Sequence, residues 1–345
     1  MTGPAADGPV VDVHCHVIAP AMLTPAVPAQ WRPLLRPGGG RPVIEFRGRE
    51  LTSAVAEFCD VDVMLAQAGA AGVTHLLLSP WILLVPAAGP ARDAARVCRV
   101  QNESLAGLAA RHPAAVRVLG AVPLADPVAA AAELEYLMSL PGVAGAEIPA
   151  RVGSYYLGDR RFLPFWEAAA GTGALIFVHP TTAGFGPAAL AGYYLWNSVG
   201  NPLETAISAA HLIAAGVLDR LPELTVLLAH GGGGLTALRG RLRRAWQVRP
   251  EAAAASPAGP DAALRRLFYD SLTHDPAVLA GLVSYAGAGQ VLLGSDRPFD
   301  MGTADPAGDV AAAGLSPGQE QAILGGTAAR LLGLAGSQAS GTGSG

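Results

Sequence analysis

Eight short apolar runs alternate with longer helical segments along the chain, and this alternation restricts the possible folds more than any other feature. Most of the runs are nearly continuous in hydrophobic residues, which is typical of parallel strands that are covered on both faces. The runs lie at residues 10–16, 73–80, 116–124, 143–150, 174–180, 224–232, 267–272 and 290–296. Segments with helical spacing separate them, for example at 92–111, 127–140 and 201–219. This order predicts an α/β protein.

Eight strands that alternate with helices predict a (β/α)8, TIM-like barrel. The alternative is an open doubly wound sheet, but no GxGxxG motif follows the first run to support it. Residues 17–52 break the alternation, because they are rich in Pro and Gly before the sequence VIEFRGREL. We expect a single barrel domain over residues 1–335, with 17–52 as an insertion after strand 1. The insertion is either a small hairpin over the barrel mouth or a surface loop, and the Gly/Ser-rich tail 336–345 should be flexible.

Composition excludes several classes of protein. The chain has 345 residues, a net charge of −4 and no basic run interleaved with aromatic residues, so we expect no nucleic-acid partner. It contains no apolar run of about 18 residues, and its N-terminus lacks the basic and apolar regions of a signal peptide. We therefore expect no membrane span. Three cysteines without CxxC spacing indicate reduced thiols and a cytoplasmic location.

The first run, VVDVHCHVIAP, carries two histidines one residue apart. Side chains alternate between the two faces of a strand, so His14 and His16 should point the same way. Asp12 should share their face at a lower level in the barrel. Cys15 should point the opposite way and pack in the core. One such pair of histidines proves little by itself, because it arises easily by chance.

Three further groups end later runs: His179 in FVHP, His230 in LLAHGGGG and Asp296 in LLGSDRPF. The C-terminal ends of barrel strands share one face, and that face carries the active site of TIM barrels. All five groups should therefore converge. Several imidazoles with one carboxylate suit zinc or another first-row divalent ion, which can acidify a bound water. A histidine that is not needed as a ligand can serve as a general acid or base.

These motifs, in this order and with the helix start PLET at 202–205, resemble the amidohydrolase superfamily. More narrowly, they resemble its mononuclear branch, the aminocarboxymuconate-semialdehyde decarboxylase-like proteins. The resemblance covers nearly the whole chain. It implies one divalent ion, zinc in the first place and manganese or cobalt as alternatives, with His230 as the catalytic acid/base. The implied metal ligands are His14, His16, His179 and Asp296.

The resemblance also points to residues that would bind the substrate. Arg241 matches a position where the family uses an Arg that reaches into the neighbouring subunit's site, which implies a homodimer; the alternative is an exposed helix face. Arg47 or Arg49, in the insertion, lies near the family's clamp for the substrate carboxylate. Arg297 stands where the branch usually has an aromatic residue, and it could pair with a substrate carboxylate or fix its own loop. The expected apolar walls are Trp196 and Phe299.

All 23 basic residues are Arg, and this bears on the number of metal ions. Binuclear members of the superfamily commonly bridge two metals with a carboxylated lysine on strand 4, and this chain has no lysine. Its fourth run instead carries Glu147. That carboxylate could bridge a second metal, form a buried ion pair or support a ligand. We favour a single metal. His274, after the seventh run, could also reach the pocket.

The function that these features favour is non-oxidative decarboxylation of an unsaturated or aromatic carboxylic acid. The alternative is a hydrolase that uses the same site on an ester, lactone, amide or C–C bond. A non-catalytic protein on a degenerate barrel predicts missing ligands, and none is missing.

Overall fold

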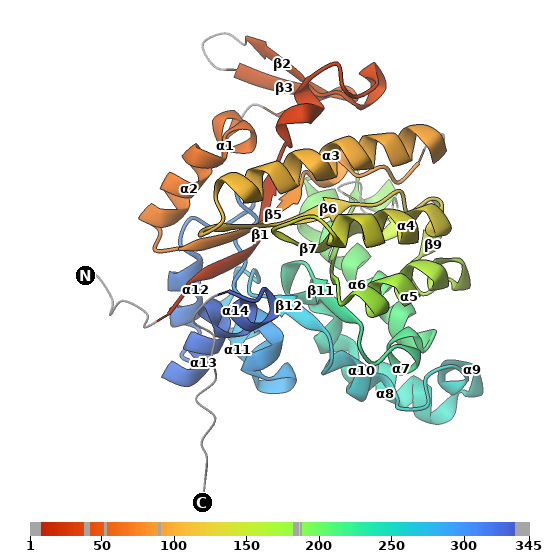
Figure 1. Cartoon of the computed structure of the whole chain (residues 1–345). Helices are drawn as coiled ribbons and strands as arrows, with labels where there is room; N and C mark the ends of the chain where they lie inside the picture. The colour runs from red at the N-terminus through yellow and green to blue at the C-terminus, as the bar shows by residue number, and fades with distance from the viewer. Residues whose placement is uncertain are drawn as a thin grey trace, which may run out of the picture.

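The computed structural model describes residues 8–37, 42–51, 54–88, 91–181, 186 and 188–334. Its centre is one eight-stranded sheet in which consecutive members of the order β1-β5-β6-β7-β10-β11-β12-β13 pair in parallel (Figure 1). The strands are β1 (Val11–Val17), β5 (His75–Pro80), β6 (Val116–Ala121), β7 (Val143–Pro149), β10 (Leu175–His179), β11 (Thr225–Leu228), β12 (Phe268–Asp270) and β13 (Val291–Leu292). All eight predicted strands are confirmed.

The sheet closes on itself where the chain after β13 lies beside β1. Three backbone hydrogen bonds form this seam: Val13 N to Leu293 O at 2.8 Å, Asp296 N to His14 O at 2.8 Å, and His16 N to Arg297 O at 2.7 Å. A closed parallel sheet confirms the TIM-like barrel and excludes the open doubly wound alternative.

Helices surround the barrel, and Figure 1 shows α3, α4 and α5 lying along one side of it. They are α1 (Val55–Cys59), α2 (Val61–Ala70), α3 (Ala91–Arg111), α4 (Pro127–Met138), α5 (Leu163–Thr172), α6 (Asn201–Ala214), α7 (Val217–Arg220), α8 (Arg239–Val248), α9 (Pro250–Ala253), α10 (Pro260–Leu264), α11 (Pro276–Ala286), α12 (Pro306–Ala312), α13 (Pro317–Gln321) and α14 (Thr327–Leu331). Several begin with Pro after an Asp cap; Asp126, for example, accepts a hydrogen bond from Ala129 N at the start of α4. The predicted helix over 201–219 is α6 followed by α7.

Residues after β1 form a small sheet at one end of the barrel. Strands β2 (Leu34–Pro37), β3 (Pro42–Phe46) and β4 (Arg49–Leu51) pair antiparallel. Arg47 and Gly48 make the two-residue turn between β3 and β4, and both have positive φ, as hairpin turns of this length favour. Of the two alternatives for the insertion, a small hairpin and a surface loop, the structure contains the hairpin, as part of this three-stranded sheet. A second short hairpin, β8 (Arg151–Val152) with β9 (Tyr155–Tyr156), follows β7.

The strand that carries the two histidines does not alternate regularly. The register of β1 against β5 shifts between Asp12 and Cys15, and Val11 and Val13 both belong to the inner barrel core. Asp12 therefore lies on the outer side, where its carboxylate accepts hydrogen bonds from the backbone and hydroxyl of Ser295. The expectation that Asp12 shares the face of His14 is wrong, because the shift lets Val13 and His14 both face inward.

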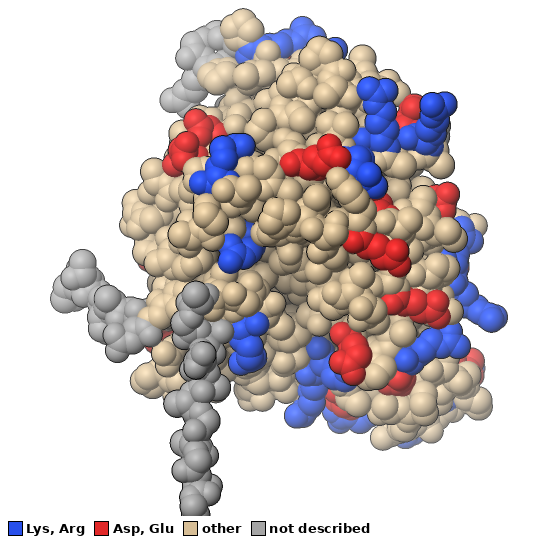
Figure 2. Space-filling model, viewed as in Figure 1, with Lys and Arg blue, Asp and Glu red and all other residues tan. Residues whose placement is uncertain are grey.

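The surface in Figure 2 is mostly uncharged, with acidic and basic side chains interspersed and no basic stripe across this face. In the described parts of the chain, no helix combines the length and the apolar character that a membrane crossing requires. The tail 336–345 lies outside the described residues.

Candidate metal centre

Four buried side chains converge at the C-terminal end of the barrel. His14 and His16 come from β1, His179 is the last residue of β10, and Asp296 follows β13. One ligand atom from each lies within 4.8 Å of all the others. Asp296 Oδ1 is 3.2 Å from His14 Nε2 and 3.1 Å from His16 Nε2. The sequence prediction that these four residues meet is therefore confirmed.

In each of the three histidines, Nδ1 lies within hydrogen-bond distance of an oxygen atom outside the cluster. His14 Nδ1 lies 2.6 Å from Asp270 Oδ2, His16 Nδ1 lies 3.2 Å from Pro80 O, and His179 Nδ1 lies 2.9 Å from Pro180 O. With each Nδ1 directed at an oxygen, each Nε2 faces the cluster, where its lone pair can bind a cation once that nitrogen carries no proton.

Two atoms of the cluster lack a hydrogen-bond partner among the described residues, although both are buried. They are His179 Nε2 and Asp296 Oδ1. Buried polar atoms without a partner are rare in folded proteins. Three inward-facing Nε2 atoms and one carboxylate form a donor set that fits a divalent ion such as zinc.

The electrostatics of the cluster favour positive charge at its centre. Although burial opposes it, His14 and the neighbouring histidines hold the pKa of Asp296 well below its usual range. Burial alone would lower the pKa of His14, but Asp296 and Asp270 raise it to about 10. Burial, followed by the charges of His16 and His14, lowers the pKa of His179 well below its usual value. The negatively charged Asp296 thus faces several imidazoles that cannot all be protonated together. A bound cation can provide the positive charge that the carboxylate lacks.

His230 stands directly after β11 at the edge of the cluster. Its Nε2 lies 3.5 Å from Asp296 Oδ2, its side chain is 17% exposed, and its Nδ1 has no partner among the described residues. Its backbone is left-handed, with φ of 56°, and so is that of Asp296, with φ of 58°. Strained backbone at non-glycine residues gathers at functional sites. A partly exposed imidazole at the edge of the cluster has the position and the chemistry to exchange a proton with a molecule bound beside it.

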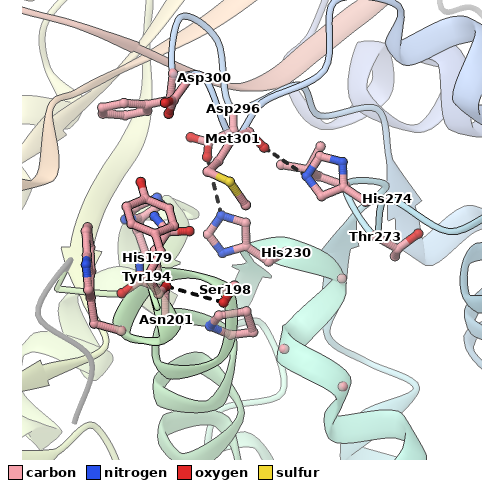
Figure 3. Close-up of a pocket in the computed structure, with 18 of the residues that line it drawn as sticks. His179, Tyr194, Ser198, Asn201, His230, Thr273, His274, Asp296, Asp300 and Met301 are labelled. Atoms are coloured by element: carbon pink, nitrogen blue, oxygen red, sulfur yellow. Dashed lines mark hydrogen bonds and ion pairs between the residues drawn. The ribbon is translucent and has the colours of Figure 1, made fainter. Parts of the chain in front are cut away.

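A cavity of about 1050 Å³ opens above the cluster. Figure 3 shows His179, His230 and Asp296 together at its wall, with Tyr194 and Asn201 beside them. Trp196 and Phe299 also line the cavity, as predicted. The ring centres of Phe299 and His16 are 5.3 Å apart. An apolar cleft with a few convergent polar groups is the usual form of a small-molecule site.

The predicted arginines divide into one that lines the cavity and three that do not. Arg49 lines it, with Cζ 5.6 Å from the Trp196 ring centre. Arg47 instead lies over Trp31, 4.2 Å from the ring centre, beside a separate shallow groove.

Arg297 is buried outside the cavity, with Nε 4.0 Å from Asp12 Oδ2. Its backbone carbonyl accepts the seam hydrogen bond from His16 N. This placement favours a role in fixing the loop, and not the contact with a substrate carboxylate. Arg241 is exposed on α8 and does not line the cavity of the single chain.

Glu147 and Asp270 are two further buried acids near the cluster. Glu147, on β7, has Oε1 3.7 Å from His16 Nδ1 and 3.9 Å from His179 Nδ1, and burial raises its pKa well above the usual value. Asp270, which the sequence analysis missed, ends β12 and accepts from His14 Nδ1. Its one sequence signal is an acid at the end of the apolar run LFYDSL, where the other strands carry their ligands.

His274 lines the cavity, as expected, and its Nε2 lies 2.8 Å from Met301 O (Figure 3). Cys15 is buried among the outer core residues, as predicted, with Sγ 3.3 Å from Leu77 O.

The sequence profile of the family described as "Amidohydrolase" matches residues 11–334. The chain belongs to the amidohydrolase family. This amidohydrolase is 31% identical over 245 residues to 2-amino-3-carboxymuconate-6-semialdehyde decarboxylase of Dictyostelium discoideum, over 70% of this chain and 68% of the relative. It is 29% identical over 300 residues to 6-methylsalicylic acid decarboxylase of Penicillium expansum, over 84% of each chain. The resemblance to the decarboxylase branch is confirmed.

A solved structure with the same fold is 5-carboxyvanillate decarboxylase of Novosphingobium aromaticivorans, in complex with manganese and 4-hydroxy-3-methoxy-5-nitrobenzoic acid. Its TM-score is 0.78 at 17% identity, and the match covers 96% of this chain and 98% of that one.

Proposed function

We propose that this amidohydrolase is a metal-dependent, non-oxidative decarboxylase of an aromatic or unsaturated carboxylic acid. One observation carries the proposal: the cluster of His14, His16, His179 and Asp296 lies beside His230 at the wall of an apolar cavity. Two relatives that bear decarboxylase names, one for an unsaturated acid and one for an aromatic acid, support this choice.

The proposed cofactor is one divalent ion held by the four residues of the cluster. When bound, the ion would hold substrate oxygens and stabilise negative charge as the bond to carbon dioxide breaks. Zinc is the expected ion from the ligand types, and manganese is an alternative that a protein of the same fold binds. Metal analysis of the purified protein decides between them, and less than about half an ion per chain would contradict the proposal, since such a site binds tightly.

Residues of the chain would supply orientation and the proton. Arg49 at the cavity wall would bind a substrate carboxylate, and Trp196 and Phe299 would hold the apolar part and exclude water. The electron pair of the broken C–C bond stays on the substrate carbon, which takes a proton from His230 Nε2 as carbon dioxide leaves. His230 then regains a proton from solvent, so the overall reaction consumes one proton.

We further propose a cytoplasmic homodimer. The support for the dimer is Arg241, an exposed residue of α8 that matches the family position for an Arg reaching into the neighbouring site. Val278, which lines the cavity, is 55% exposed. Tyr193 and Leu238, each next in sequence to a cavity-lining residue, are 96% and 47% exposed. A second subunit would cover apolar side chains such as these.

The test is a His230→Asn variant assayed for carbon dioxide release on a panel that includes 6-methylsalicylate and 2-amino-3-carboxymuconate-6-semialdehyde. We expect turnover to fall at least 100-fold with metal content near that of the unmodified protein, because His230 supplies the proton and is not a ligand. Equal turnover in the variant would contradict the role of His230. Hydrolysis of esters or lactones without carbon dioxide release would favour the hydrolase instead.

A further inference from the structure

Asp270 is fully buried at the end of β12, and its carboxylate accepts four hydrogen bonds. Oδ2 accepts from His14 Nδ1 at 2.6 Å and from the backbone N–H of His230 at 2.8 Å. Oδ1 accepts from the backbone N–H of Gly231 at 2.7 Å and of Leu272 at 3.2 Å. A single oxygen atom therefore joins a metal ligand on β1 to the residue that would transfer the proton after β11.

Only a carboxylate can satisfy this set of partners. Three of them are backbone N–H groups, which always donate, and the fourth is a ring nitrogen whose proton leaves Nε2 free for the cluster. An amide side chain would turn an NH2 group toward at least one donor. The loss would fall on a fully buried site, where an unsatisfied polar group is costly.

Both ends of this bridge matter for the chemistry. The bond to His14 Nδ1 fixes the ring orientation and the tautomer that a metal ligand needs. The bond to His230 N holds a non-glycine residue in a left-handed conformation, with φ of 56°, which is otherwise unfavourable.

We propose that Asp270 is a positioning residue that couples the metal site to the acid/base His230. The inference rests on the proposed function for the role of His230 and of the metal. Asp270 itself acts through the two histidines and lies outside the set of cavity-lining residues.

The test compares Asp270→Asn with Asp12→Asn in the full-length protein. Asp12 is a matched control, because it is fully buried and accepts hydrogen bonds from the backbone N–H of His14 and from the N–H and hydroxyl of Ser295, with none of these bonds from the His14 ring or from His230. We expect Asp270→Asn to raise the dissociation constant for manganese or zinc about 10- to 100-fold. At saturating metal, kcat should still fall about 100-fold with a smaller change in KM, because His230 is displaced.

For Asp12→Asn, we expect metal affinity within about threefold of the unmodified protein. Equal metal affinity in Asp270→Asn and the unmodified protein would overturn the proposal. So would an equal loss in both variants, because that result would reflect general packing.

A second measurement needs neither metal nor activity. In nitrogen-15 NMR of the unmodified, metal-free protein, His14 should show a downfield, slowly exchanging Nδ1 proton, assigned by its loss in His14→Gln. The absence of this proton would overturn the proposal even if Asp270→Asn fails to fold. A protein that shows the proton but binds no metal would contradict the proposed function and leave the Asp270 bridge in place.

Discussion

The His14 imidazole lies between two carboxylates, and its ionisation shows how neighbours outweigh burial at the scale of one residue. Burial would lower its pKa, yet Asp296 and Asp270 raise it to about 10. In the same cluster burial, followed by the charges of His16 and His14, lowers the pKa of His179 well below the usual value. The cluster thus combines one negatively charged carboxylate with several ring nitrogens that cannot all be protonated at once. When a divalent ion binds, it stabilises the carboxylate, and all the ring nitrogens that face the ion can be deprotonated.

An ion pair far from the cluster allows a pH prediction at the same scale. Asp261 binds Arg243 through two contacts of 2.5 and 2.8 Å and accepts a hydrogen bond from Tyr285. Arg243 lowers the pKa of Asp261 from 3.8 to about 2, so the pair stabilises the folded state above pH 4 and is lost as pH falls toward 2. We expect Asp261→Asn to cost about 1 kcal/mol at pH 7, after allowance for solvent screening, and less than half of that at pH 2.

Urea unfolding at both pH values checks this prediction, with the exposed Glu135→Gln in α4 as the control. A loss that is the same at pH 7 and pH 2 would contradict it, since protonation should remove the ion pair in the unmodified protein too.

At the scale of elements, the strands were predictable and their irregularities were not. Continuous hydrophobic runs predicted all eight barrel strands, because both faces of each strand are covered by other parts of the protein. The register shift in β1 left no such signal, although it lets Val13 and His14 both face the barrel interior. Alternation therefore placed Asp12 on the wrong face. A shift of this kind depends on how β1 meets its neighbours, which the pattern of one strand does not contain.

The glycine run after β11 supports a prediction about packing between elements. A Cβ on Gly233 would lie 1.8 Å from Pro202 O at the start of α6, whereas a Cβ on Gly234 would meet nothing within 4 Å. Both glycines have positive φ, of 63° and 80°. Gly234→Ala should cost about 1–2 kcal/mol of unfolding free energy for the left-handed backbone alone. Gly233→Ala should cost clearly more, because α6 must also move.

Equilibrium unfolding in urea measures the two costs, and circular dichroism at 222 nm reports whether each variant folds. Equal costs would mean that the run does not pack against α6 as the structure has it.

At the scale of the whole molecule, the meeting of the four cluster residues was predictable, and the directions of most of the arginines proposed for the substrate were not. The ligands end strands, and a barrel brings all strand ends to one face wherever they lie in the sequence. Arg47 and Arg49 are only two residues apart in the insertion, yet Arg49 lines the cavity and Arg47 packs on Trp31. Arg297 turned toward Asp12 and away from the cavity. The direction of a long side chain on a loop depends on tertiary contacts, which spacing does not reveal.

The closure of the barrel gives the cluster a second role, in stability. The seam between β1 and the chain after β13 is also where His14 and His16 on one side face Asp296 on the other. A bound ion would therefore cross-link the seam. Removing it with a chelator should lower the melting temperature, since at 1,000 times its dissociation constant a ligand contributes about 4 kcal/mol. The loss of stability should be local. On metal removal, hydrogen exchange should speed up more for the amides of the seam, such as those of Val13 and Asp296, than for the amides that pair β6 with β7. Hydrogen exchange with and without chelator measures this difference. Uniform loss of protection around the barrel would mean that the ion stabilises the fold without holding the seam.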